Sequence, residues 1–198
     1  MNLHHQLKEF ADKLGEKIDA LTNEIYMLAE RDVYETDIDG NFVLLFRIPR
    51  ASVTEIDIST EAYSTIQAVF EDADVIYFTG GNSFFLMDRL RKTGTDGLLK
   101  KELANGKLMI GESAGAIICA PTIQYIEQMD EKPEDYSQED NEGLDLIDFY
   151  VLPHYLTAPF KKITERIIAE FSDLNICAIN NHQAIIVNDE GSKVICKD

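Results

Sequence analysis

A serine in a sharp turn between an apolar strand and a buried helix is the first group in this sequence that could do chemistry. Ser113 is the centre of the motif Gly-Glu-Ser-Ala-Gly at residues 111–115, which follows the apolar residues 108–110 and opens an uncharged helical stretch over residues 114–120. Small residues around such a serine let strand and helix approach closely and expose its hydroxyl above the sheet. The pattern predicts a nucleophile elbow, and a glycine-rich turn with an idle serine is the alternative.

An activated serine needs a base within hydrogen-bond reach. His154 closes the apolar run 149–153 and therefore stands at the carboxyl end of a predicted strand, where parallel α/β sheets place their ligands. Because Ser113 occupies the same end of its own strand, we expect His154 to be the base. His182 follows the strand pattern at residues 176–179 and is either a second candidate base or a residue that lines the pocket.

The serine also needs two backbone donors for the oxyanion. Gly80, Gly81 and Asn82 follow the predicted strand 75–79 at the same edge of the sheet. Successive glycines let a backbone N–H approach a reacting carbonyl, and the helix that starts next adds its positive end. We expect Gly81 and Ala114 to donate their N–H groups to the oxyanion; an ordinary glycine turn capped by Asn82 is the alternative.

The third member of a triad is an acid that orients the base. The chain order serine, acid, histidine puts it between positions 113 and 154, and Glu127 is favoured over Asp130 because it ends the apolar stretch 123–126. Residues 127–148 hold ten acids against the single base Lys132. This segment is predicted to be a solvated connecting loop, with a mobile lid beside the site as the alternative.

Apolar strand patterns alternate with helical patterns through most of the chain and must position these groups. Strands are expected at residues 74–79, 108–110, 149–153, 176–179 and 184–187, with helices at 83–92, 97–104 and 160–171. Several strands are continuously apolar, which is expected when helices cover both faces of a parallel sheet. The fold class is therefore α/β, although the last two strands could instead form a hairpin at one edge.

The composition limits the class of protein. With 198 residues and 45% hydrophobic content the chain fits one domain. A net charge of −18 repels nucleic acid and anionic membrane surfaces, so neither is an expected partner. No apolar run is long enough to span a membrane, and the N-terminus resembles an amphipathic helix (7–18) rather than a signal peptide, which predicts a cytoplasmic protein.

Metal and cofactor sites are not expected. No pair of the three cysteines, Cys119, Cys177 and Cys196, has zinc-knuckle spacing, and they are interpreted as structural residues. The histidines form no His-x-x-x-His pair with an acid between them.

Three blocks together resemble the peptidase E (aspartyl dipeptidase) family of serine peptidases: Thr-Gly-Gly-Asn-Ser-Phe-Phe-Leu (79–86), Ile-Gly-Glu-Ser-Ala-Gly-Ala (110–116) and Leu-Pro-His-Tyr (152–155). They occur in the family's order, and the resemblance runs from about Glu55 to the end of the chain. It implies a fold like the class I glutamine amidotransferases, a flavodoxin-like three-layer sandwich in which helices flank a mostly parallel central sheet.

The resemblance implies Ser113 as nucleophile, His154 as base, Gly81 and Ala114 as oxyanion donors, and an acid between residues 127 and 130. The implied substrate is a small peptide, such as a dipeptide with an N-terminal aspartate. Family members bind its carboxylate through a basic residue beyond the histidine, for which this chain offers three candidates: Lys161, Lys162 and Arg166. The alternative is a catalytically impaired binding or scaffold member of the same fold.

The N-terminus departs from the family pattern, which usually opens with a strand in the middle of the sheet. This chain opens with a helical pattern, followed by strand patterns at residues 24–29 and 42–48 with an Asp-Gly turn at 39–40 between them. The whole chain is therefore interpreted as one α/β domain in which residues 1–54 are divergent. A rearranged edge or a homodimer that completes the sheet would be consistent with a missing first strand.

Overall fold

The computed structural model describes residues 33–36, 42–46, 53–137, 140–189 and 191–196. It divides into two units, Met1–Glu55 and Ile56–Asp198.

In the first unit, β1 (Val33–Thr36) pairs antiparallel with β2 (Phe42–Phe46). β2 lies within the strand predicted at residues 42–48, whereas β1 was not predicted. The predicted helix 7–18, strand 24–29 and turn 39–40 lie outside the described residues, and the single-domain interpretation stays a prediction.

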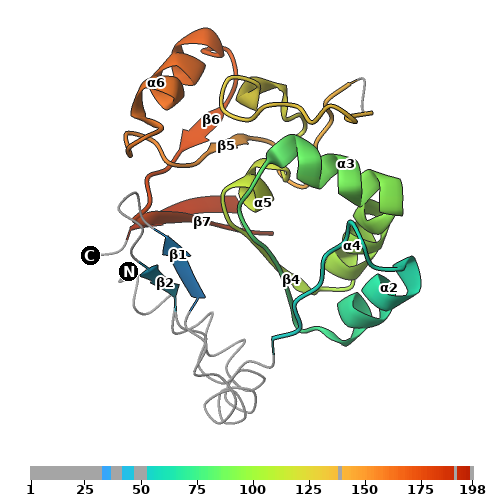
Figure 1. Ribbon diagram of the computed structural model, residues 1–198. Coiled ribbons are helices and arrows are strands. Elements are labelled where there is room, and N and C mark those ends of the chain that lie inside the picture. The colour runs from blue at the N-terminus through green and yellow to red at the C-terminus, as the bar shows by residue number, and fades with distance from the viewer. Residues whose placement is uncertain (1–32, 37–41, 47–52, 138–139, 190, 197–198) are drawn as a thin grey trace. The chain divides into compact units, whose positions relative to one another are not determined.

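The second unit alternates helices and strands, as the apolar pattern predicts. In chain order its elements are α2 (Tyr63–Asp72), β3 (Val75–Phe78), α3 (Ser83–Thr93), α4 (Thr95–Ala104), β4 (Leu108–Gly111), α5 (Ala114–Ile117), the 3-10 turn η1 (Gln124–Ile126), β5 (Tyr150–Leu152), α6 (Lys161–Glu170), β6 (Ile176–Ala178), β7 (Gln183–Asn188) and β8 (Gly191–Cys196). Figure 1 shows these elements along the chain.

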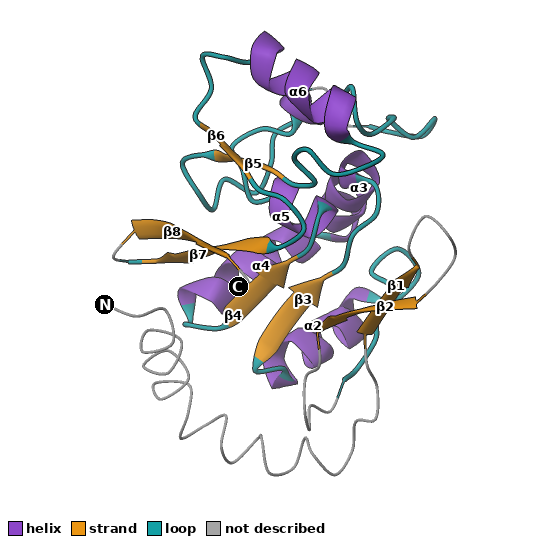
Figure 2. Cartoon of the chain, turned by 90° about the vertical axis from the view of Figure 1, so that its left-hand side faces the viewer, coloured by secondary structure: helices purple, strands orange, loops and turns teal. Residues whose placement is uncertain are grey.

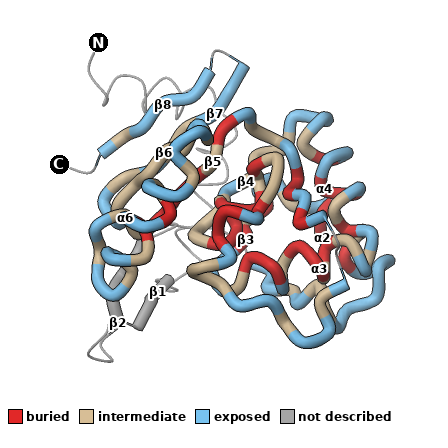
Figure 3. The backbone as a smooth tube through the Cα atoms, turned by 90° about the horizontal axis from the view of Figure 1, so that it is seen from above, coloured by how far each residue is buried: buried red, intermediate tan, exposed pale blue. Residues whose placement is uncertain are grey.

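The parallel pair β3–β4 carries the serine turn and one face of it forms part of the core. Its register joins Val75 to Leu108 and Phe78 to Gly111. Alternate residues of β3 are buried and belong to one apolar cluster with side chains of α2, α3 and α4. Figure 2 shows these strands and helices, and Figure 3 marks the buried residues in red. Val75 and Ile110, on the other face, are each 39% exposed. The helices therefore bury one face of this pair.

The α/β class is confirmed, but the expected three-layer sandwich around a continuous sheet is not seen. The described strands form four two-stranded sheets: β1–β2, β3–β4, β5–β6 and β7–β8. β3, β4, β5 and β6 are three or four residues long, and in the described part of the chain each pairs with a single neighbour. Among the described residues, Val75 and Ile110 on one face of β3–β4 stay partly exposed, whereas continuously apolar strands had suggested helices on both faces.

The C-terminal strands pair differently from the suggested alternative. β6 pairs parallel with β5, with Leu152 opposite Ala178, and β7 forms an antiparallel hairpin with β8. The hairpin therefore begins one strand later than the sequence had suggested. Because β5 and β6 run parallel, their carboxyl ends lie side by side, and the loops that follow them meet.

Candidate active site

The turn at Ser113 has the geometry of a nucleophile elbow. Its backbone has φ 48° and ψ −108°, a conformation that residues other than glycine rarely adopt. A Cβ added to Gly111 would lie 2.3 Å from the carbonyl oxygen of Gly115, and one added to Gly115 would lie 2.5 Å from that of Phe78. Strand, turn and helix therefore approach as closely as glycine permits.

The structure brings Ser113 and His154 together. Ser113 Oγ lies 2.9 Å from His154 Nε2, within the distance at which a base can take a proton. The two residues follow β4 and β5, the strands predicted to carry them. Tyr125 links the segment after the elbow to β5, since its hydroxyl donates a hydrogen bond of 2.6 Å to the carbonyl of Val151, and burial raises the pKa of this hydroxyl.

The imidazole of His154 is held from its other side by two groups that the sequence did not suggest. Nδ1 lies 2.8 Å from Asn181 Oδ1, and the Phe160 ring stacks on the imidazole with centroids 4.9 Å apart and planes 25° apart. The backbone of His154 has φ 60°. The sequence places Asn181 just after the predicted strand 176–179, but its approach to His154 depends on the pairing of β6 with β5, which the sequence did not predict.

The structure does not bring Glu127 to the histidine. Glu127 Oε1 accepts hydrogen bonds from Lys132 Nζ at 2.6 Å and Asn141 Nδ2 at 3.2 Å. Asp130 also has another partner, since its Oδ2 accepts from the backbone N–H of Ser83 at 2.8 Å. Chain order pointed to these acids, but both are used to hold the segment that contains them.

The glycine turn after β3 lies against the serine. A Cβ at Gly80 would come within 3.4 Å of Ser113 Cβ, and Gly81 has φ 135°, which favours glycine. Among the described residues, the N–H groups of Gly81 and Ala114 donate no hydrogen bond within the protein. Asn82 is the N-cap of α3, and its Oδ1 accepts from Phe85 N at 2.9 Å. The turn thus combines the predicted cap with the N–H of Gly81, and the elbow contributes the N–H of Ala114.

His182 lies in the loop next to Asn181 and is exposed. Its backbone N–H donates to Asn180 Oδ1 at 2.9 Å, which closes a tight turn. Across the described part of the chain, its ring makes no hydrogen bond or ion pair with Ser113 or His154. The structure therefore pairs the serine with His154 and leaves His182 at the edge of the same loop.

The acidic segment, residues 127–148, is joined to α3 by hydrogen bonds and ion pairs. Asp88 of α3, whose side chain is 1% exposed, accepts from Ser137 Oγ at 2.8 Å and lies 2.7 Å from Lys92 Nζ. Arg89 pairs with Asp135, and Arg91 lies 3.3 Å from Asp140. Basic residues of one helix thus hold carboxylates of the segment, so its described parts are more than a solvated connection.

The cysteine beside the elbow has the features of a structural residue. Cys119 Sγ donates to the carbonyl of Gly115 at 3.4 Å, and burial raises the pKa of the thiol to about 12.

In the described ranges, no three His, Cys, Asp or Glu side chains gather to hold a metal ion. No helix there has the length and apolar composition needed to cross a bilayer.

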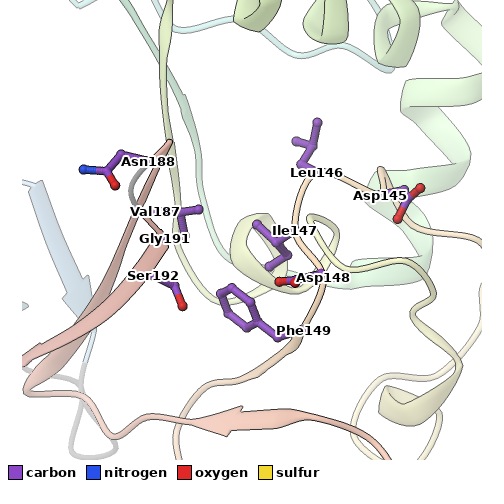
Figure 4. A pocket seen from close by; sticks show the side chains of 9 residues that line it. All are labelled: Asp145, Leu146, Ile147, Asp148, Phe149, Val187, Asn188, Gly191 and Ser192. Carbon is purple, nitrogen blue, oxygen red and sulfur yellow. The ribbon is translucent and has the colours of Figure 1, made fainter.

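A cavity of about 530 Å³ lies away from these groups. It is lined by residues 145–149 and by Val187, Asn188, Gly191 and Ser192 of the β7–β8 hairpin (Figure 4). Phe149 precedes β5, whereas His154 follows it, so cavity and histidine lie at opposite ends of that strand.

The comparisons with known proteins agree with the motif blocks. The model of the family described as Peptidase family S51 matches residues 31–195, and so begins inside the stretch that the sequence had treated as divergent. An uncharacterized peptidase of Listeria innocua is 48% identical over 139 residues, which are 70% of this chain and 66% of that protein. The chain thus spans about two thirds of that relative's length.

Two further similarities carry the name peptidase E. The crystal structure of a putative peptidase E protein from Listeria monocytogenes EGD-e superimposes with a TM-score of 0.70 at 42% identity, covering 73% of this chain and 70% of that one. Peptidase E of Streptomyces coelicolor is 34% identical over 90 residues, which are 45% of this chain and 35% of that protein.

Proposed function

Because the chain belongs to peptidase family S51, we propose that it is a serine peptidase that hydrolyses small peptides through an acyl-enzyme on Ser113. The observation that carries the proposal is the 2.9 Å approach of Ser113 Oγ to His154 Nε2 at a strained elbow. A serine hydroxyl is a weak nucleophile, and an adjacent base is what activates it.

In the first half of the reaction, His154 Nε2 takes the hydroxyl proton while Ser113 Oγ forms a bond to the peptide carbonyl carbon. The negative charge that develops on the carbonyl oxygen needs preorganised donors. The candidates are the N–H group of Ala114, the residue after the serine, and that of Gly81, which follows the Gly80 that packs against Ser113. The C–N bond then breaks, and the imidazolium gives its proton to the leaving amine, which departs as the free amino end of the product.

In the second half, water replaces the amine. His154 takes a proton from the water as its oxygen bonds to the acyl carbon, and the same two N–H groups hold the second oxyanion. The ester bond to Ser113 Oγ breaks and the proton returns to that oxygen. The products are a carboxylic acid and the restored serine, so no co-reactant other than water is needed.

For the substrate we propose a peptide of dipeptide size, with an acidic N-terminal residue as the first candidate. The cations that could bind its carboxylate, Lys161, Lys162 and Arg166, are exposed on α6. Lys161 is the best placed along the chain, because it follows the Phe160 ring that stacks on His154. A lysine lacks the bidentate geometry of arginine, so discrimination between acidic and neutral residues is expected to be modest.

The test is covalent labelling with a fluorophosphonate, followed by hydrolysis of a dipeptide library. Wild-type protein is expected to become labelled at Ser113, and Ser113→Ala to remain unlabelled. His154→Ala should slow labelling by at least about 100-fold because the base is lost. Equal labelling of wild type and Ser113→Ala would refute the proposal. Absence of labelling and hydrolysis, together with a dipeptide-induced rise in melting temperature, would favour the binding protein instead.

A further inference from the structure

The group that holds the far side of the candidate base is a neutral amide. Asn181 Oδ1 lies 2.8 Å from His154 Nδ1, and an amide oxygen is only an acceptor. The ring nitrogen that faces it must therefore carry the proton. In the neutral imidazole this leaves a lone pair on Nε2, directed at the Ser113 hydroxyl 2.9 Å away. This is the tautomer that a general base needs.

We infer that Asn181 is the positioning residue of His154 and takes the place that a carboxylate occupies in a serine-histidine-acid triad. The inference rests on the proposed function, because it assigns a partner to the base of that reaction. Asn181 touches neither the serine nor the reacting atoms, and it acts by fixing the tautomer and orientation of the imidazole.

The backbone around Asn181 places it by several hydrogen bonds. Ile179 N donates to the carbonyl of Leu152, and Tyr155 N donates to the carbonyl of Ile179, both at 2.9 Å. These two hydrogen bonds join the segments that follow β5 and β6. Gln183 closes the turn that contains Asn181: its side-chain Oε1 accepts from Asn180 N at 2.9 Å. The amide is thus presented to His154 by two joined strand ends.

The Phe160 ring completes the restraint. It stacks on the imidazole with ring centroids 4.9 Å apart and planes 25° apart. This stacking limits rotation of the imidazole about the Cβ–Cγ bond. A partner at Nδ1 and a ring on one face leave Nε2 as the ring nitrogen that is open to Ser113. Together they hold the geometry that a proton transfer needs.

The carboxylates that the sequence places beside the serine or in the expected chain order have other hydrogen-bond partners. Glu112, next to the serine, accepts a hydrogen bond from the hydroxyl of Tyr77. Glu127 and Asp130 are bound by Lys132 and by the backbone of Ser83, respectively.

Three other titratable residues are the chain neighbours of the groups that surround the imidazole. Tyr155 follows His154 itself, Lys161 follows Phe160, and His182 follows Asn181. None of them makes a hydrogen bond or ion pair with the imidazole among the described residues, so Asn181 is the polar partner of Nδ1.

A neutral partner has a chemical consequence. A carboxylate stabilises the protonated imidazolium by charge, whereas an amide oxygen offers only a dipole. Replacing Asn181 by aspartate should keep the acceptor but favour the protonated ring, which cannot accept the serine proton. The acidic limb of the pH–rate profile should then move to higher pH, by about one pH unit for an adjacent opposite charge.

The experiment measures the rate of fluorophosphonate labelling between pH 5 and 9 for wild type, Asn181→Ala, Asn181→Asp and Asn175→Ala. Asn181→Ala should slow labelling by about 100-fold through loss of orientation. Asn181→Asp should restore most of the rate at pH 9 and show the shifted limb. Asn175→Ala is the matched control, an exposed amide at the other end of β6, and should label within about twofold of wild type.

Three results would overturn the inference: unchanged labelling of Asn181→Ala, an unmoved acidic limb in Asn181→Asp, or equal damage from Asn175→Ala. If wild type itself is not labelled, the proposed function fails, and nitrogen NMR of the His154 ring then decides about Asn181 alone. A single tautomer protonated at Nδ1 in wild type that is lost in Asn181→Ala supports the inference. Mixed tautomers in the wild type contradict it.

Discussion

At the scale of single residues, the serine turn depends on glycines more than on the serine itself. Gly111 lies so close to the carbonyl of Gly115 that any side chain would overlap backbone atoms rather than a flexible side chain. The backbone there cannot move without moving β4 or α5. The conformation of Ser113, with φ 48°, is therefore imposed by packing around it.

Replacing Gly111 by alanine is expected to destabilise the protein by about 1–3 kcal/mol because the added methyl group is forced into backbone atoms. Fluorophosphonate labelling should fall with it. Gly97→Ala is the matched control: it lies inside α4 with no atom within 4 Å of the added Cβ, and should stabilise by about 0.5–1 kcal/mol. Urea unfolding measures both. Equal stability of the two variants would contradict close packing at the elbow.

The sequence was sufficient to pair Ser113 with His154, because strand ends can be recognised from apolar runs and parallel strands align those ends. It was insufficient for the third group. Chain order and charge directed attention to Glu127, whereas hydrogen bonding to an imidazole needs only an acceptor at the right place. Asn181 could be recognised as the partner of His154 only from the pairing of β6 with β5, a long-range contact that local sequence patterns do not encode.

At the scale of elements, helix α3 and the acidic segment are joined through a buried carboxylate. Desolvation alone would raise the pKa of Asp88, but hydrogen bonds from Lys92 and Ser137 outweigh it, so the pKa lies below its usual value. A carboxyl with a depressed pKa stabilises the folded state above its unfolded pKa of about 4 and loses this contribution as the pH falls below it.

Asp88→Asn should therefore cost about 1–3 kcal/mol at pH 7, where the lost charge-assisted bonds matter most. The difference from wild type should shrink as the pH falls below about 4, because the carboxyl of Asp88 then takes up a proton in the unfolded chain before it does so in the folded state. Asp173→Asn, an exposed residue, serves as the control and should follow wild type at every pH. Urea unfolding across this range is the measurement, and a constant difference between Asp88→Asn and wild type would count against the assignment.

The same scale shows which elements were hard to foresee. The apolar runs of β3, β4, β5 and β6 are distinctive, and each was predicted within a few residues. β8 (Gly191–Cys196) is exposed and polar along much of its length, so it lacks an apolar pattern and forms through its hairpin with β7. The separation into two-stranded sheets was also missed, because pairing between strands depends on tertiary geometry rather than on local composition.

At the scale of the whole molecule, charge is the dominant feature. The chain has 36 acidic and 18 basic residues, a formal charge of −18. Such an excess weakens the compact state by self-repulsion, even though some acids pair with α3.

Raising NaCl from about 20 mM to 500 mM should screen this repulsion and raise the melting temperature by about 2–4 °C per kcal/mol gained. Calorimetric or fluorescence melting curves measure the change, and sucrose of equal osmolality controls for effects unrelated to charge. A melting temperature that falls with NaCl would mean that local ion pairs outweigh the net repulsion.

The bonds between α3 and the acidic segment also limit how this chain can be recombined with its relatives. Asn82 caps α3 and donates from its amide to the carbonyl of Glu131 at 2.6 Å, while Asp130 binds the next backbone N–H of the helix. Helix and segment thus share one set of partners although about fifty residues separate them. In a chimeric enzyme the two would have to be exchanged together, because either one grafted alone would lose the hydrogen bonds that join Asn82, Ser83 and Asp88 to the segment.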